Sequence, residues 1–126
     1  MIEKNSTLIL LVDDEEFLMD VSKQIIEGAG YNVLTASSGA EALKVINQNQ
    51  KNIHLLITDV VMDGMSGQEL AKKVLIINPS VKVIYTSGYG HEILENEKNP
   101  KENLAFLQKP FAPNDMMKKI HEVLKQ

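Results

Sequence analysis

Polar residues that could do chemistry stand directly after four short apolar runs. The run Leu8–Val12 is followed by Asp13 and Asp14, and a later run ends on Asp59. The other two runs end in Thr86-Ser87-Gly88 and in Lys109-Pro110. Three neighbouring carboxylates would repel one another, and a hard cation such as Mg²⁺, which takes oxygen ligands and water, would offset that repulsion. Since a carboxylate can also attack phosphorus, the set favours metal-assisted phosphoryl transfer onto an aspartate.

The apolar runs alternate with amphipathic stretches. Continuous apolar runs are typical of buried parallel strands, and five are expected: Leu8–Val12, Val33–Ala36, His54–Thr58, Val81–Thr86 and Leu104–Leu107. Helical spacing predicts an apolar face on the first helix at Phe17, Leu18, Val21, Ile25 and Ile26. Capping boxes at Ser38 and Ser66 predict the starts of two further helices, and Pro113 suits the first turn of the last one.

Five strand–helix units predict one α/β domain spanning residues 1–126, a right-handed, doubly wound parallel sheet. The polar segment 91–103 predicts a short or frayed fourth helix. Ligands of such sheets bind at the carboxyl ends of the strands. The four polar pieces should therefore meet at one edge of the sheet.

Composition narrows the chemistry that this site can use. The 126 residues carry a net charge of −4, contain no Cys, and have Lys as their only basic residue apart from three His. The absence of Cys excludes disulfides, thiolate metal sites and a Cys nucleophile. Without Arg there is no guanidinium to clamp phosphate or read guanine, so we expect no direct nucleic-acid binding. The apolar run Leu8–Val12 is too short to span a bilayer, and we expect a cytoplasmic domain with no membrane contact.

Each piece taken alone has a simpler explanation. Asp13 and Asp14 would more often cap the following helix, and Asp59 before a glycine-rich segment would more often belong to a turn. Ser87-Gly88 could be a loop and Lys109 a solvated strand end. The three His residues are scattered and suggest neither a metal cluster nor a proton relay. The functional interpretation gains weight because all four pieces occur in order, each after its own strand.

These motifs together resemble the response-regulator receiver family of two-component signalling over essentially the whole chain. The acidic pair Asp13-Asp14, the segment from Asp59 to Gly67, the Ser87-Gly88-Tyr89 triplet and the segment from Phe106 to Phe111 are similar to the motifs of that family. The sequences Ser87-Gly88-Tyr89 and Leu107 to Phe111 are especially similar to those of receivers in hybrid sensor histidine kinases. The resemblance implies a flavodoxin-like (βα)5 fold with strand order 2-1-3-4-5.

The resemblance also implies a role for each matching residue. Asp59 is expected to be the phospho-acceptor, with Lys109 and Ser87 holding phosphoryl oxygens. Asp14, Asp59 and the Val61 backbone carbonyl are expected to bind Mg²⁺ directly, and Asp13 through water. Ser87 is preferred over Thr86 as the switch hydroxyl because the small Gly88 follows it. Phe106 is the expected switch aromatic, which reshapes the face made by the fourth helix, fifth strand and last helix.

One residue departs from the family pattern. Asp63 stands four residues after Asp59, where the family commonly has Pro. Because Pro would stiffen the loop and Asp63 adds another acid, we expect somewhat weaker Mg²⁺ binding.

The expected partners are a histidine kinase or phosphotransfer protein and an unknown downstream protein, and no outside substrate is expected to be turned over. Both a stand-alone regulator and the receiver part of a hybrid kinase remain open. A Mg²⁺-dependent phosphatase would usually carry a second Asp two residues after the first, where this chain has Val61. An FMN carrier would need a hydroxyl-rich loop in place of Asp13-Asp14. A degenerate receiver would lack one of the key positions, and none is missing.

Overall fold

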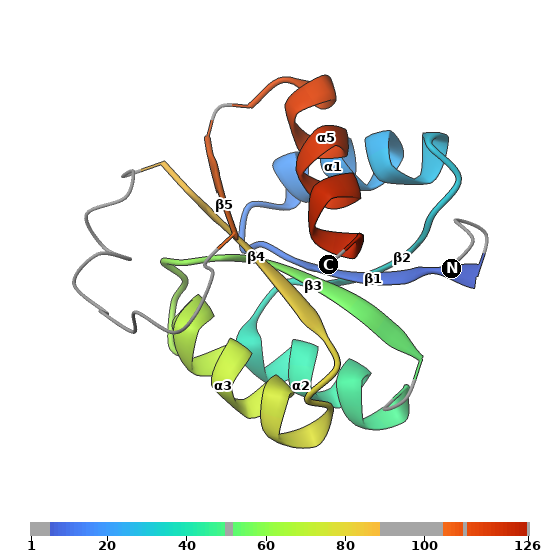
Figure 1. The fold of residues 1–126 in the computed structure, drawn as a ribbon. Helices are drawn as coiled ribbons and strands as arrows, with labels where there is room; N and C mark the ends of the chain where they lie inside the picture. The colour runs from blue at the N-terminus through green and yellow to red at the C-terminus, as the bar shows by residue number, and fades with distance from the viewer. Residues whose placement is uncertain (1–5, 50–51, 89–104, 110, 126) are drawn as a thin grey trace.

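The computed structural model describes residues 6–49, 52–88, 105–109 and 111–125 (Figure 1). Its elements are β1 (Leu8–Val12), α1 (Glu16–Gly28), β2 (Asn32–Ala36), α2 (Gly39–Gln48), β3 (Ile53–Asp59), α3 (Gly67–Ile77), β4 (Lys82–Ser87), β5 (Ala105–Gln108) and α5 (Pro113–Leu124). All neighbouring strands are parallel, in the order β2-β1-β3-β4-β5. The predicted flavodoxin-like sheet is therefore confirmed. The fourth helix expected within 91–103, and Leu104, Tyr89 and Pro110, lie outside the described residues.

The sheet separates two hydrophobic cores. Figure 1 shows α1 and α5 on one face of the sheet and α2 and α3 on the other. Alternate residues of β3 enter opposite cores, so that Ile57 packs under α1 and α5 while Leu56 packs over α2 and α3. Both side chains are at least 99% buried, and full burial of such a side chain stabilises the fold by about 1.5–3 kcal/mol. Two filled cores explain why β1 and β3 are apolar without alternation.

The helix starts predicted at Ser38 and Ser66 are confirmed. Ser38 Oγ accepts the Glu41 N–H at 3.1 Å, and Ser66 Oγ accepts the Glu69 N–H at 3.2 Å. The Glu41 carboxylate accepts a hydrogen bond from the Ser37 hydroxyl at 2.9 Å. Since the first turn of a helix has N–H groups without helical partners, these side chains fix where α2 and α3 begin. No helix in the described part of the chain is long and apolar enough to cross a bilayer.

The predicted buried face of α1 was partly wrong. Met19, Ser22 and Ile26 are the buried residues of α1, whereas Phe17 is 77% exposed and Val21 40% exposed. Successive helical residues advance by about 100°, so Phe17 and Met19 point to opposite sides of the helix. The sheet packs against the Met19 side of α1, and Phe17 and Val21 lie on the side that faces away from the sheet.

His54 has a structural role at the start of β1, at the opposite end of that strand from the acidic pair. The β1–β3 register shifts between Leu8 and Ile9, whose partners are Ile53 and Leu55, so His54 is the extra residue of a bulge. The Leu8 N–H donates to His54 Nδ1 at 3.0 Å. The imidazole therefore gives the Leu8 N–H an acceptor at the point where the bulge interrupts the β1–β3 pairing.

Candidate functional site

Asp13, Asp14 and Asp59 converge at the carboxyl ends of two central strands. Val12 of β1 pairs in register with Thr58 of β3, so the next residue along each strand, Asp13 or Asp59, emerges beside the other. Carboxylate oxygens of the three acids lie within 4.8 Å of one another. Asp13 and Asp59 are buried, and Asp14 is exposed. The convergence expected from the parallel sheet is confirmed.

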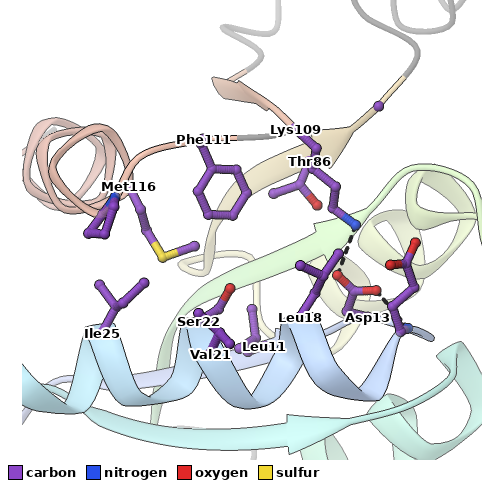
Figure 2. A pocket seen from close by; sticks show the side chains of 13 residues that line it. Leu11, Asp13, Leu18, Val21, Ser22, Ile25, Thr86, Lys109, Phe111 and Met116 are labelled. Atoms are coloured by element: carbon purple, nitrogen blue, oxygen red, sulfur yellow. Dashed lines mark hydrogen bonds and ion pairs between the residues drawn. The ribbon is translucent and has the colours of Figure 1, made fainter.

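Lys109 joins this cluster from the end of β5. Its Nζ donates to Asp13 Oδ2 at 2.9 Å and to Asp59 Oδ2 at 3.1 Å. Figure 2 shows the side chain reaching down to Asp13 across the mouth of a groove. The Lys109 backbone N–H also donates to the Ser87 carbonyl at 2.8 Å, which continues the β4–β5 pairing. Backbone pairing thus aims the ammonium at two acids that are 96 and 50 residues away in sequence.

Burial and charge act in opposite directions on these groups. Burial raises the pKa of the Asp59 carboxyl, the charge and hydrogen bond of Lys109 lower it, and the charges of Asp13 and Asp14 raise it again, leaving it above its usual value. Burial lowers the pKa of the Lys109 ammonium, but hydrogen bonding and charge from Asp13, and then from Asp59, outweigh burial and leave that pKa raised. Lys109 therefore stays charged, while the negative charge on Asp59 is only partly compensated.

The donor set fits a hard divalent cation. Three carboxylates supply only oxygen atoms, and one Lys leaves the cluster with a net negative charge. Asp13 already accepts the Glu15 N–H on Oδ1, at 2.9 Å, and Lys109 on Oδ2. Both Asp13 oxygens are therefore occupied, which is compatible with the predicted contact of Asp13 to an ion through water, and the direct ligation by Asp14 and Asp59 stays a prediction. The Val61 carbonyl as a ligand stays a prediction.

Neither acid of the pair is the N-cap residue of α1. The N-cap of α1 is Glu15, whose side chain makes no capping hydrogen bond. Asp13 holds the Glu15 N–H just before the helix, while its second oxygen binds Lys109. The Asp13 side chain therefore serves both the chain turn and the acidic cluster.

Two hydroxyls lie at the end of β4. Thr86 pairs in register with Asp59, and its carbonyl accepts the Val60 N–H at 2.9 Å. Ser87 follows and is 99% buried. The choice of Ser87 over Thr86 as the switch hydroxyl stays a prediction. Phe106, the expected switch aromatic, is half-buried opposite Tyr85 and packs against the core between the sheet and the helices α2 and α3.

A groove that was not predicted from the sequence lies beside the acids. It has a volume of about 540 Å³ and runs between α1 and α5. Figure 2 shows Leu18, Val21 and Ile25 along its α1 side, facing Phe111 and Met116, with Asp13, Thr86 and Lys109 at one end. Its two walls are about 90 residues apart in sequence, so no local pattern reveals the groove. The available signal was that α1 carries more apolar residues than one face packed on the sheet can bury.

Comparison with known proteins gives the family. The model of the response regulator receiver domain matches residues 9–121. The response regulator receiver protein CpdR of Brucella abortus (strain 2308) is 30% identical over 116 residues, which are 92% of this chain and 95% of CpdR. Sensor kinase CckA of the same organism is 29% identical over 121 residues, 96% of this chain and 13% of the kinase. The chain therefore spans only a small part of that relative.

Solved structures agree with the family match. The receiver domain of the hybrid histidine kinase CckA superposes with a TM-score of 0.80 and 32% identity, covering 93% of this chain and 98% of that one. A CheY-like receiver from Methanospirillum hungatei JF-1 gives a TM-score of 0.83 and 32% identity, with 94% of each chain covered. The chain belongs to the response regulator receiver family of two-component signalling.

Proposed function

We propose that this domain accepts a phosphoryl group on Asp59 from a phosphohistidine, with Mg²⁺ bound by Asp14 and Asp59. The observation that carries the proposal is the Asp59 carboxylate itself, buried in a three-acid cluster and hydrogen-bonded to Lys109 at 3.1 Å. A buried acid beside like charges and one ammonium has the perturbed pKa that is characteristic of functional sites.

In this proposal an Asp59 oxygen attacks phosphorus while the phosphorus–nitrogen bond of the donor breaks. The bonding electron pair stays on the imidazole, and an acyl phosphate forms on Asp59. Lys109 and Ser87 hold phosphoryl oxygens, and Asp14 keeps the metal beside the acceptor. A bound Mg²⁺ supplies charge neutralisation at the phosphoryl oxygens.

The neighbouring charges decide whether Asp59 is a competent nucleophile. The raised pKa favours the protonated carboxyl, which cannot attack. Lys109 opposes this effect at 3.1 Å, and a cation ligated by Asp14 and Asp59 would oppose it further. A filled metal site would therefore help to keep Asp59 ionised, which would couple metal binding to acceptance of the phosphoryl group.

The site supports a self-modifying switch better than a phosphatase. Residue 61, where a phosphatase of this chemistry usually has its acid–base Asp, is Val61 with a 48% exposed apolar side chain. An outside phosphoester would find no acid there to protonate its leaving group. The domain would therefore catalyse only its own phosphorylation and dephosphorylation.

The groove between α1 and α5 is the surface that we assign to the donor. A phosphohistidine must approach Asp59 over the carboxyl ends of the strands, where the groove ends at Asp13 and Lys109. Exposed Phe17 and Val21 extend the apolar surface of α1. Burial of such residues by a donor would give affinity, while the acids and Lys109 would receive the phosphoryl group.

The downstream partner in this proposal is a protein, with no direct contact to nucleic acid, in keeping with the absence of Arg and the net charge of −4. A cytoplasmic location stays a prediction.

Incubation with Mg²⁺ and acetyl phosphate, followed by mass spectrometry, tests the proposal. One phosphoryl group should appear on wild-type protein and none on Asp59→Asn, and chelation of Mg²⁺ should prevent the reaction. Beryllofluoride with Mg²⁺ should shift the NMR signals around Asp59, Ser87 and Lys109. Wild-type protein that gains no phosphoryl group would overturn the proposal.

A further inference from the structure

Gly67, the first residue of α3, lies against the peptide that carries the acceptor. A Cβ built on Gly67 would overlap the Asp59 carbonyl oxygen and would lie 3.0 Å from the Asp59 carbonyl carbon and 3.1 Å from Val60 Cα. These are backbone atoms, which cannot move aside as the end of a flexible side chain can. Only glycine permits this approach of α3 to β3.

Two hydrogen bonds hold this peptide, and a third holds the next one, between Val60 and Val61. The Val60 N–H donates to the Thr86 carbonyl and the Gly67 N–H donates to the Val60 carbonyl, each at 2.9 Å. The Thr58 hydroxyl donates to the Asp59 carbonyl at 3.1 Å. The chain from 60 to 66 therefore leaves Asp59 and returns to it, and Gly67 closes the loop at the residue next to the acceptor.

A second, softer contact holds the loop on its other side. Met65 packs on Gly39, the first residue of α2, where an added Cβ would lie 2.9 Å from Met65 Cβ and 2.9 Å from its sulfur. The Met65 sulfur lies at the end of a flexible side chain and can give way, whereas Met65 Cβ can move only if the 60–66 loop shifts with it. The loop is thus fixed rigidly at Gly67 and more loosely at Gly39.

We propose that Gly67 is a positioning residue for the acceptor, because it sets where the Asp59 backbone and the 60–66 loop lie relative to Asp14 and Lys109. A side chain at position 67 would push the Asp59–Val60 peptide away from α3. Asp59 and the Val61 carbonyl would then no longer match the position of Asp14. The inference rests on the proposed function, since it concerns Mg²⁺ bound at this site.

Three Gly→Ala variants of the whole chain test this inference by Mg²⁺ titration, followed by NMR or calorimetry. Gly67→Ala should weaken Mg²⁺ binding by about tenfold or more, the range seen when the groups that orient metal ligands are changed. Gly39→Ala should weaken it by no more than about threefold, because the added Cβ meets side-chain atoms of Met65 and not the backbone of the acceptor. Gly28→Ala, where an added Cβ meets nothing within 4 Å, is the matched control and should leave the affinity unchanged.

A merely structural role for Gly67 would lower Tm but leave the Mg²⁺ affinity of the folded protein intact. A folded Gly67→Ala variant with wild-type affinity would overturn the inference. If that variant does not fold, Thr58→Val decides, since it removes one hydrogen bond to the same peptide at nearly constant volume. Weaker Mg²⁺ binding by Thr58→Val supports the inference and unchanged binding overturns it. Wild-type protein that binds no Mg²⁺ would instead contradict the proposed function.

Discussion

The Lys109 ammonium lies 3.1 Å from Asp59 Oδ2, and the same ammonium lies 2.9 Å from Asp13. One cation is therefore shared between the acceptor and a second buried acid. In the proposed function, Lys109 would compete with a metal ion for these carboxylates and would also offer a positive charge to an incoming phosphoryl group.

Lys109→Gln should separate these two effects. Phosphorylation by acetyl phosphate should slow by roughly 100-fold, because a preorganised charge at the reacting oxygens is lost. Mg²⁺ affinity should rise, because a competing cation has left the acidic cluster. Rapid-quench kinetics and Mg²⁺ titration measure the two quantities. Lys119→Gln is the control, because the Lys119 ammonium pairs with Glu122 on α5 at 3.7 Å and not with the acidic cluster. Parallel loss of rate and Mg²⁺ affinity would contradict the assignment.

Asp59→Asn should stabilise the metal-free protein at neutral pH. The pKa of Asp59 is raised in the folded state above its ordinary 3.8, so the folded protein holds this proton more tightly than the unfolded chain does. Stability should therefore fall as pH rises from about 3.8 through the raised pKa, and the Asn variant should escape this loss.

Thermal melts in chelator between pH 4 and pH 8 measure this difference. Tm of Asp59→Asn should exceed that of the wild type by a few degrees at pH 7, given about 4 °C for each kcal/mol in a domain of this size. Added Mg²⁺ should raise Tm of the wild type and not of the variant. Equal Tm values at pH 7 in chelator would refute the expected balance of charges.

Ser87→Ala and Thr86→Val should differ in their response to beryllofluoride. Loss of the Ser87 hydroxyl should weaken binding of the phosphoryl mimic by about tenfold, the size of one hydrogen bond to a charged group. It should also abolish the change in the Phe106 ring signals. Thr86→Val keeps the shape beside Asp59 and should bind almost normally. The reverse result would assign the switch to Thr86.

Phe17→Glu should impair phosphorylation by a protein donor and leave phosphorylation by acetyl phosphate intact. The substitution places a charge on the apolar surface of α1 that the donor is proposed to bury, and a loss of about tenfold in transfer rate is expected. Ile76→Glu is the matched control, because Ile76 is 82% exposed on α3 while Phe17 is 77% exposed on α1. Equal transfer by both variants would exclude this surface.

Asp63→Pro should tighten Mg²⁺ binding severalfold. Asp63 is exposed and precedes Gly64, whose φ of +79° suits glycine, and Pro at 63 would restrict the residue before it to extended backbone. The charges that act on the pKa of Asp59 belong to Lys109, Asp13 and Asp14. The effect of Pro should therefore come from stiffness, and Asp63→Asn should change little. If calorimetric titrations give the same Mg²⁺ affinity for the wild type and both variants, the stiffness of the loop does not control Mg²⁺ binding.

Much of the fold could be predicted because local rules agree with the tertiary structure. Ser38 and Ser66 start helices wherever their chain lies, since capping depends on the next three residues. Strands such as β1 are apolar on both faces only when both faces are covered, which predicts a parallel sheet between two helical layers. The exposure of Phe17 and Val21 could not be predicted in this way, because helical spacing does not say which of two apolar faces packs against the sheet.

The sequence by itself determined the acids, the hydroxyls and the lysine, and placed each at the end of a strand. Only the tertiary structure decided that Lys109 contacts Asp13 and Asp59, that Asp14 stays exposed, and that α1 and α5 leave a groove beside them. The reason is that strand order and register bring together residues that are 50 to 96 positions apart. Side-chain contacts at such separations depend on packing of the whole sheet, which no local pattern encodes.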